Sequence, residues 1–310
     1  MADLSVKIAG MELRSCVFNA AGPKDVTLKE LETIAASRSA AITMKSCTKE
    51  PRQGNEEPRY YTLDAGSINS MGLPNLGYKE YVKFAAALKN FGKPVIASVS
   101  GLCLEDNIQI LKAFNDSESS AIELNLSCPN IKGKPQIGYD FNQMDEVLKE
   151  ALRVSKKPMG VKLPPYFDFV HFDEAAAILK KRKPAFISSI NSIGNALVID
   201  ADREMTVIRP KGGFGGLGGP YIKYTALANV RKFYELLDGK IPVVGVGGIS
   251  SGRDAFEFIL AGASAVQIGT AFIEEGPSVF GRVQDELASL MARKNYPRLD
   301  DFRGKLKKME

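Results

Sequence analysis

Eight short apolar runs, each followed by a stretch with helical character, recur along the chain of 310 residues. The runs cover residues 17–21, 41–45, 95–99, 121–126, 160–163, 186–190, 243–246 and 265–268. In one of the helical stretches, Phe172, Ala176 and Leu179 fall on a single face. Runs that are apolar on both faces and alternate with helices are typical of a parallel sheet covered on both sides.

Eight such units predict an α/β chain folded as one closed (β/α)8 barrel, a TIM barrel, over residues 1–310. The alternative is an open doubly wound sheet. Polar or glycine-rich residues follow nearly every run, among them Lys45, Asn125 and Lys162. A barrel builds its active site from strand ends around the whole ring, whereas an open sheet concentrates it at one switch point. The distribution of these residues therefore favours the barrel.

Two connections are too long to be plain turns. They are residues 46–77, after the second predicted strand, and residues 192–219, after the sixth. Long loops in compact domains tend to be functional or to carry structure of their own. We therefore expect small extra elements in both.

Composition excludes several classes of site. The chain has one histidine, His171, so a site with two or three histidine ligands is excluded and we expect no metal. Its four cysteines have no C-x-x-C spacing, and their scatter suggests a reducing, cytoplasmic compartment. The net charge of +5 is spread along the chain, so we expect no nucleic-acid partner. No apolar run reaches the length of about 18 residues that would predict a membrane span.

Glycine-rich strand ends point to a phosphate site. Gly247 and Gly248 follow the seventh run, and Gly269 and Thr270 follow the eighth. The loops after these two strands often bind phosphate in barrels, so we favour a phosphate site over the alternative of plain tight turns. The segment 213–218 matches G-x-G-x-x-G, but it lies late in a long loop, so we favour a flexible or close-approach loop over a dinucleotide fold.

Two lysines and a thiol are the strongest candidates for chemistry. Lys45 and Lys162 each end a predicted strand, which favours an anionic ligand or cofactor at the barrel mouth. Cys128 precedes Pro129 and is therefore expected in a turn or loop. From the residues alone, a base or nucleophile and an inert thiol are both open for Cys128.

Other side chains fit less demanding roles. Amides at strand ends and turns suit a ring with alternating C=O and N–H groups, although turn chemistry would also explain Asn69 and Asn130. Cys16 and Cys103 are expected to be buried thiols, and His171 is expected to pack at a helix start.

Several segments together resemble the dihydroorotate dehydrogenases of soluble class 1A. They are residues 66–75, 125–130, 133–136, 160–168, 191–195 and 302–305, so the resemblance spans essentially the whole chain. It implies an FMN-containing barrel that oxidises (S)-dihydroorotate to orotate in pyrimidine synthesis. It further implies that the electrons pass to fumarate and that the protein is a homodimer. A related FMN-barrel pyrimidine reductase, or a dehydrogenase with another acceptor, is the alternative.

The resemblance also implies roles for individual residues. Cys128 matches the base that removes a C5 proton while hydride leaves C6 for the flavin N5. Substrate binding carries over to Lys45, Asn69, Met71, Gly72, Leu73, Asn125, Pro129, Asn130, Asn191 and Ser192. FMN binding carries over to Ala21, Gly22, Lys45, Ser46, Asn125, Lys162, Ile190, Gly219, Gly247, Gly248, Gly269 and Thr270.

The chain differs from the membrane and NAD-linked classes of dihydroorotate dehydrogenase, and at one segment it also differs from class 1A. The membrane class uses serine as base and has an N-terminal helical extension, so Cys128 and the short N-terminus favour class 1A. The NAD-linked class has a different motif after the second strand. Pro23, Lys24 and Asp25 stand where class 1A members usually carry smaller or apolar residues, and this segment abuts the expected flavin site.

Overall fold

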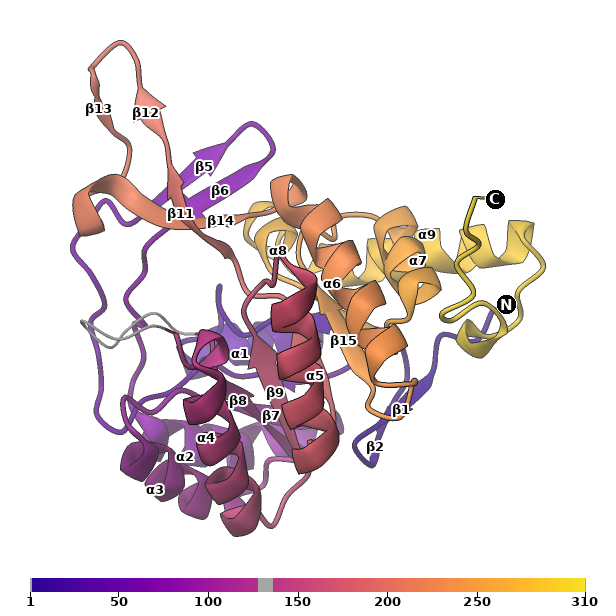
Figure 1. The fold of residues 1–310 in the computed structure, drawn as a ribbon, viewed down its shortest axis with the longest axis horizontal. Helices are drawn as coiled ribbons and strands as arrows, with labels where there is room; N and C mark the ends of the chain where they lie inside the picture. Colours follow the sequence, from indigo (N-terminus) through magenta and orange to yellow (C-terminus); the bar gives the residue numbers. More distant parts are fainter. Residues whose placement is uncertain (1, 128–135, 310) are drawn as a thin grey trace.

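The computed structural model describes residues 2–127 and 136–309. An eight-stranded parallel sheet forms its centre, with helices packed around it (Figure 1). The strands are β3 (Val17–Asn19), β4 (Ile42–Thr43), β7 (Val95–Val99), β8 (Ala121–Asn125), β9 (Met159–Leu163), β10 (Ile187–Ser189), β15 (Val243–Val246) and β16 (Ala265–Ile268). Each lies in or overlaps one of the predicted runs, and their residues are buried on both faces, so the predicted barrel is confirmed.

The barrel is joined at its seam by a side chain. Strand pairing runs β3-β16-β15-β10-β9-β8-β7-β4, which leaves β3 and β4 as the two ends of the ladder. Asn19 bridges them, because its Nδ2 donates to the Thr43 carbonyl at 2.7 Å and its Oδ1 accepts from the Thr43 N–H at 2.8 Å. The amide thus makes the two hydrogen bonds that a paired strand would make.

Nine helices are present in the described residues, and most of them surround the sheet. They are α1 (Leu28–Ala36), α2 (Tyr78–Leu88), α3 (Leu104–Asn115), α4 (Phe141–Val154), α5 (Phe169–Arg182), α6 (Lys223–Leu236), α7 (Gly252–Ala261), α8 (Thr270–Glu275) and α9 (Ser278–Arg293). Short 3-10 turns lie at Lys89–Phe91, Ile137–Tyr139, Pro210–Gly213, Pro220–Ile222 and Leu299–Asp301. Local sequence fixes several ends: Ser251 and Asp254 form a capping box that begins α7, and Gly262 ends it at φ 127°.

The two long connections meet in one sheet above the barrel, which we call the mouth sheet. The first contributes β5 (Tyr60–Leu63) and β6 (Gly66–Asn69), and the second contributes β11 (Ile193–Leu197) and β14 (Phe214–Gly218), in the order β11-β14-β6-β5. Extra elements were predicted in both loops, but their pairing was not. The G-x-G-x-x-G segment is largely β14, so it forms part of a strand and no dinucleotide turn.

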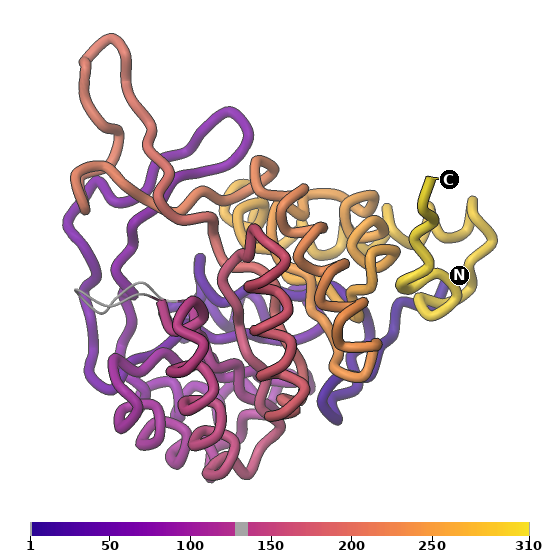
Figure 2. Tube along the Cα trace, viewed as in Figure 1, coloured from indigo at the N-terminus to yellow at the C-terminus, as the bar shows by residue number. Residues whose placement is uncertain are grey.

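A hairpin of β12 (Ile199–Asp200) and β13 (Met205–Thr206) extends from the mouth sheet and projects away from the barrel (Figures 1 and 2). At the opposite side, β1 (Val6–Ile8) and β2 (Met11–Leu13) form a second hairpin before the first barrel strand. The two ends of the chain lie close together, where the Asp3 N–H donates to the Pro297 carbonyl at 2.8 Å (Figure 2). Within residues 2–127 and 136–309, no helix has the length and apolar character needed to cross a bilayer.

Candidate active site

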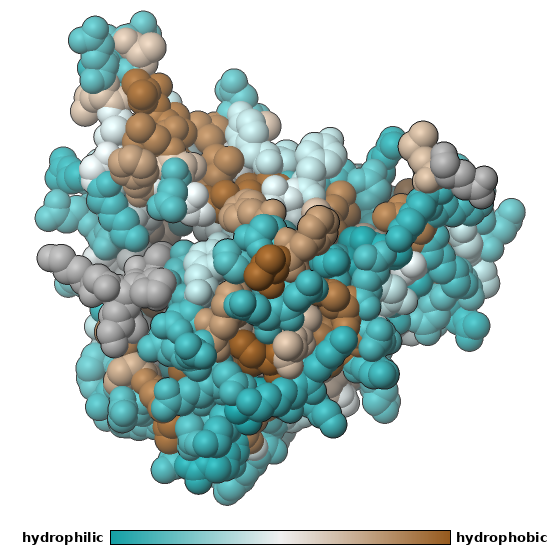
Figure 3. Space-filling view, in the orientation of Figure 1, coloured by the Kyte–Doolittle hydropathy of each residue, from teal (hydrophilic) through white to brown (hydrophobic). Residues whose placement is uncertain are grey.

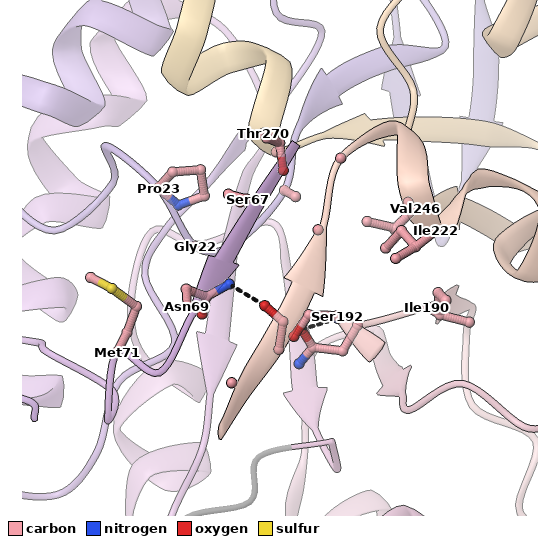
Figure 4. Close-up of a pocket in the computed structure, with 18 of the residues that line it drawn as sticks. Gly22, Pro23, Ser67, Asn69, Met71, Ile190, Ser192, Ile222, Val246 and Thr270 are labelled. Atoms are coloured by element: carbon pink, nitrogen blue, oxygen red, sulfur yellow. Dashed lines mark hydrogen bonds between the residues drawn. The ribbon is translucent and has the colours of Figure 1, made fainter. Parts of the chain in front are cut away.

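A cavity of about 350 Å³ lies at the carboxyl ends of the barrel strands, under the mouth sheet. Figure 4 shows side chains converging on it from separate elements, including Asn69 on β6, Ile190 after β10 and Thr270 after β16. Every predicted ligand residue that the structure describes lines this cavity: Ala21, Gly22, Lys45, Ser46, Asn69, Met71, Gly72, Leu73, Asn125, Lys162, Ile190, Asn191, Ser192, Gly219, Gly247, Gly248, Gly269 and Thr270. The fold thus brings together residues from seven of the eight barrel units.

A continuous hydrogen-bonded chain crosses the polar side of the cavity. Ser46 Oγ lies 2.7 Å from Ser98 Oγ, and the Asn125 amide donates to Ser46 Oγ at 3.3 Å. Ser127 Oγ donates to Asn125 Oδ1 at 2.7 Å, and Asn191 Nδ2 donates to Ser127 Oγ at 2.6 Å. Because donor and acceptor of Asn125 both have partners, the orientation of its amide is fixed before any ligand binds.

Two nearly buried lysines line the cavity. Lys45 is 6% exposed; its ammonium donates to the Gly22 carbonyl and lies 3.8 Å from Asp25 Oδ1. Lys162 is 3% exposed and, in the described part of the chain, forms no ion pair at hydrogen-bonding range. Burial lowers the pKa of Lys162, and the nearby Glu123 carboxylate offsets this only in part. The cavity therefore holds one lysine beside a carboxylate and one without such a partner.

A polar layer fills the barrel beneath Lys162. Thr43, Glu123, Ser188 and Gln267 come from β4, β8, β10 and β16, which are alternate strands of the ring, as in the side-chain layers of (β/α)8 barrels. Ser188 Oγ donates to Glu123 Oε2 at 2.5 Å, and Gln267 Nε2 donates to the same oxygen at 3.2 Å. Oε2 of Glu123 is therefore bound to neutral donors, whereas its Oε1 is buried and has no hydrogen-bond partner among the residues that the structure describes.

The other end of the cavity is formed by glycine turns. Gly247 and Gly248 have φ values of 128° and 72°, which side chains rarely adopt. A Cβ on Gly248 would lie 2.9 Å from the Gly219 carbonyl oxygen, and one on Gly218 would lie 3.1 Å from Thr270 Oγ1. The positive φ values make glycine the favoured residue at 247 and 248, a Cβ on Gly218 would crowd the Thr270 hydroxyl, and the cavity-lining backbone beside that hydroxyl suits an anion such as phosphate.

Apolar side chains complete the walls. Ile190, Ile222 and Val246 gather on one side of the cavity in Figure 4, and each is nearly buried. The sequence indicated Ile190 but not the other two, since nothing local distinguishes a core isoleucine from one that faces a cavity. With the lysines and the glycine turns, these walls make a site that fits a flat aromatic ring carrying a phosphate tail.

The turn that follows β6 is shaped by a residue that the sequence analysis missed. Gly72 and Leu73 have φ values of 73° and 55°, and a Cβ on Gly72 would collide with the Asn55 side chain. The Asn55 amide donates to the Ser70 carbonyl at 2.7 Å and so holds the turn. On β6 itself, Asn69 Nδ2 donates to the Gly216 carbonyl at 3.2 Å, which ties the two halves of the mouth sheet together (Figure 4).

Asp25 is the most unusual residue that sequence reasoning left without a role. It is fully buried, and its Oδ2 accepts from the Gly22 N–H at 2.6 Å. Burial raises the pKa of Asp25 to about 6, and Lys45 opposes this rise only in part. The one available signal was a charged residue a few positions after a predicted strand, in a segment that departs from class 1A.

Three predicted site residues, Cys128, Pro129 and Asn130, lie outside the described residues. The residues that flank this stretch, Ser127 and Gln136, both line the cavity.

The other three cysteines and the single histidine do not line the cavity. Cys16 and Cys47 are buried, and burial raises the pKa of the Cys16 thiol to about 12. The prediction that Cys103 is buried was wrong: it is exposed, because it stands at the N-cap of α3 on the surface. His171 lies in the first turn of α5 as predicted, where its backbone N–H donates to Asp168 Oδ1 at 2.9 Å, but its side chain is exposed and not packed in the core. The described residues contain no cluster of ligands that could hold a metal ion.

The sequence matches the family model described as dihydroorotate dehydrogenase over residues 3–291. It is 51% identical to the probable dihydroorotate dehydrogenase A (fumarate) of Enterococcus faecalis over 310 residues, covering 99% of this chain and 100% of the relative. It is 49% identical to dihydroorotate dehydrogenase A (fumarate) of Lactococcus lactis, covering 99% and 100%. Dihydroorotate dehydrogenase (fumarate) of Lachancea kluyveri is 47% identical, with 98% of each chain covered.

Solved structures support the fold independently. The crystal structure of a dihydroorotate dehydrogenase from Eimeria tenella in complex with ferulenol superposes with a TM-score of 0.84, covering 97% of this chain and 88% of that one. Sequence identity to it is 21%, so this similarity carries the architecture alone.

Proposed function

The chain belongs to the dihydroorotate dehydrogenase family, and we propose that it oxidises (S)-dihydroorotate to orotate in pyrimidine synthesis, with fumarate as electron acceptor. The observation that carries this proposal is full-length similarity to fumarate-linked relatives, joined to one cavity that contains every described residue of the expected site. The whole of residues 1–310 acts as one domain.

The family depends on FMN, which supplies a hydride acceptor when it is bound. In this chain, the glycine turns at Gly219, Gly248 and Gly269 and the Thr270 hydroxyl would hold the phosphate. The apolar walls would cover the flavin ring and exclude water from it. Lys162 would stabilise negative charge on the reduced ring, because it is a buried cation that forms no ion pair with any residue the structure describes.

The amides bind the pyrimidine ring. Asn69, Asn125 and Asn191 can each donate and accept, which matches the alternating C=O and N–H groups of dihydroorotate. Lys45 binds the substrate carboxylate through its ammonium group. The hydrogen-bonded chain through Ser46 and Ser127 supports this proposal, since it holds Asn125 and Asn191 in fixed orientations.

Cys128 removes the C5 proton as general base. It follows Ser127, which lines the cavity, and the thiol must lose its proton before it can act. Cys128→Ser should retain FMN and orotate binding and lose about 10²–10⁴-fold in turnover at neutral pH. Cys103→Ser is the matched control, because that thiol is exposed on the outer surface and its loss should change nothing. Unchanged turnover in Cys128→Ser would refute the role.

A product assay with several acceptors tests the whole reaction. Purified, FMN-loaded protein is given dihydroorotate with fumarate, NAD⁺ or a quinone, and orotate is measured. We expect fumarate to support the fastest turnover, and preference for another acceptor would overturn that part of the proposal. Dihydrouracil lacks the carboxylate that Lys45 binds, so it should be a far poorer substrate. If dihydrouracil were preferred, the related pyrimidine reductase would be the better description.

We also propose that the protein is a homodimer, joined through the projecting hairpin and the adjoining mouth sheet. Leu197, Ile199, Met205 and Phe214 are 44%, 62%, 55% and 46% exposed, and apolar surface gathers on this arm in Figure 3. A two-stranded hairpin is marginally stable alone in water, so a partner surface that covers it is favourable.

Sedimentation velocity of the wild type and of Ile199→Asp tests the dimer. The wild type should sediment as a dimer at micromolar concentration and the variant as a monomer with its FMN retained. An Ile199→Asp protein that stayed dimeric would place the interface elsewhere. The cytoplasm is the compartment we propose, in keeping with the free thiols Cys16, Cys47 and Cys103.

A further inference from the structure

We propose that Asp25 is a positioning residue for Lys45, and that its charge sets how strongly this corner of the cavity attracts an anionic ligand. The inference rests on the proposed function, because orotate and bound FMN are its probes. Asp25 does not line the cavity itself and acts through the lysine.

Three short contacts join Asp25, Gly22 and Lys45 into one unit. The Gly22 N–H donates to Asp25 Oδ2 at 2.6 Å, and the Lys45 N–H donates to the Asp25 carbonyl at 3.2 Å. The Lys45 ammonium donates in turn to the Gly22 carbonyl. Backbone and side chain of Lys45 are therefore both held by the loop between β3 and α1, so Asp25 controls where the ammonium lies.

The second carboxylate oxygen of Asp25, Oδ1, faces the Lys45 ammonium and can act on it electrostatically. Oδ1 is buried, has no hydrogen-bond donor among residues 2–127 and 136–309, and lies 3.8 Å from Lys45 Nζ. A buried carboxylate oxygen without a donor is costly, so it attracts the nearest cation. A ligand carboxylate bound by Lys45 must compete with Asp25 for the same ammonium.

The charged groups around Asp25 act in opposite directions on its ionisation, so its charge can change with pH. Lys45 and Lys162 favour its ionised form, whereas Glu30, at the start of α1, opposes it. Tyr81 on α2 lies nearby, but its hydroxyl is engaged with the Val26 carbonyl at 3.0 Å. Burial outweighs the lysines and raises the pKa of Asp25 to about 6. Below that pH, Lys45 is uncompensated and should bind anions tightly; above it, the carboxylate cancels part of the attraction.

The test is the pH dependence of the orotate Kd, read from the absorbance change of bound FMN. In the wild type, Kd should rise about fivefold from about pH 5 to about pH 7.5, as Asp25 loses its proton. Asp25→Asn keeps an acceptor for the Gly22 N–H but cannot ionise, so its Kd should stay low across this range. Its FMN midpoint potential at the upper pH should also be more positive than that of the wild type. Asp173→Asn, which removes an exposed carboxylate on α5, is the matched control and should behave as wild type.

The outcomes separate this inference from the proposed function. An Asp25→Asn protein with the pH profile and potential of the wild type would overturn the role of Asp25 while leaving the dehydrogenase proposal intact. If Asp25→Asn failed to take up FMN, the wild type alone would decide. An orotate Kd that did not change with pH would overturn the role of Asp25, and a Kd that rose near pH 6 would support it. Failure of every protein to bind orotate would instead contradict the proposed function, and the midpoint potential would then decide the role of Asp25.

Discussion

The two lysines of the cavity are similar in burial and different in surroundings. Lys45 lies beside the Asp25 carboxylate at 3.8 Å and is tied to the loop after β3. Lys162 lies on β9 and forms no ion pair within the described residues; the nearby Glu123 carboxylate, which accepts from Ser188 and Gln267, acts on it only from a longer distance. Lys45 can exchange its contact with Asp25 for a substrate carboxylate that is already charged, whereas Lys162, which has no such contact, gains most when negative charge develops during the reaction.

The largest effect should come from removing the uncompensated cation. Lys162→Met should lower kcat by about 10²–10³-fold, because charge that develops on the reduced flavin loses its partner. Lys45→Met should act mainly by raising KM, since it removes a contact made equally before and during reaction. Steady-state kinetics with saturating fumarate distinguish the two patterns. Equal losses of kcat in both variants would contradict the prediction that the two lysines act at different stages of the reaction.

A smaller effect is expected on stability. Because burial raises the pKa of Asp25 to about 6, folding disfavours its carboxylate, and the wild type loses stability as pH rises from about 4 through about 6. Asp25→Asn should therefore raise the free energy of unfolding by up to about 3 kcal/mol at about pH 7.5, with the gain vanishing near pH 4. Urea unfolding of the FMN-stripped chain measures this, with Asp173→Asn as control. A gain that persisted unchanged at the lower pH would have a cause other than ionisation.

The smallest effect is the coupling between Asp25 and each lysine in orotate binding. A double-mutant cycle of Asp25→Asn with Lys45→Met should give an interaction energy of about 1 kcal/mol. The same cycle with Lys162→Met should give clearly less, because no direct contact joins Asp25 to Lys162. Similar values in both cycles would mean that the two lysines share one electrostatic environment.

The barrel was predictable because each strand carries its own local signal. Every parallel strand lies in or overlaps a short, mostly apolar run, and the capping box at Ser251 marks a helix start within the sequence itself. The seam was not predictable, since the pairing of Asn19 with Thr43 depends on how the ring closes. Likewise β14 is glycine-rich and pairs with β6, almost 150 residues earlier, so no local sequence pattern predicts the mouth sheet.

The candidate site was predictable where chemistry-bearing residues end strands, as Lys45 and Lys162 do, and where glycines follow strands, as Gly248 does. Asp25 was noticed but received no role, because its burial depends on the loop after β3 closing over Lys45. Ile222 and Val246 were missed because the side of a core residue that faces a cavity is decided by tertiary packing. The role of Cys128 stays a prediction.

A single anaerobic titration shows whether this cavity oxidises dihydroorotate on bound FMN. Purified protein should be yellow, and its flavin absorbance near 450 nm should bleach when (S)-dihydroorotate is added without any acceptor, with about one orotate formed per flavin. Addition of fumarate should restore the colour. Flavin that stays oxidised in the presence of excess dihydroorotate would rule out this activity for the cavity.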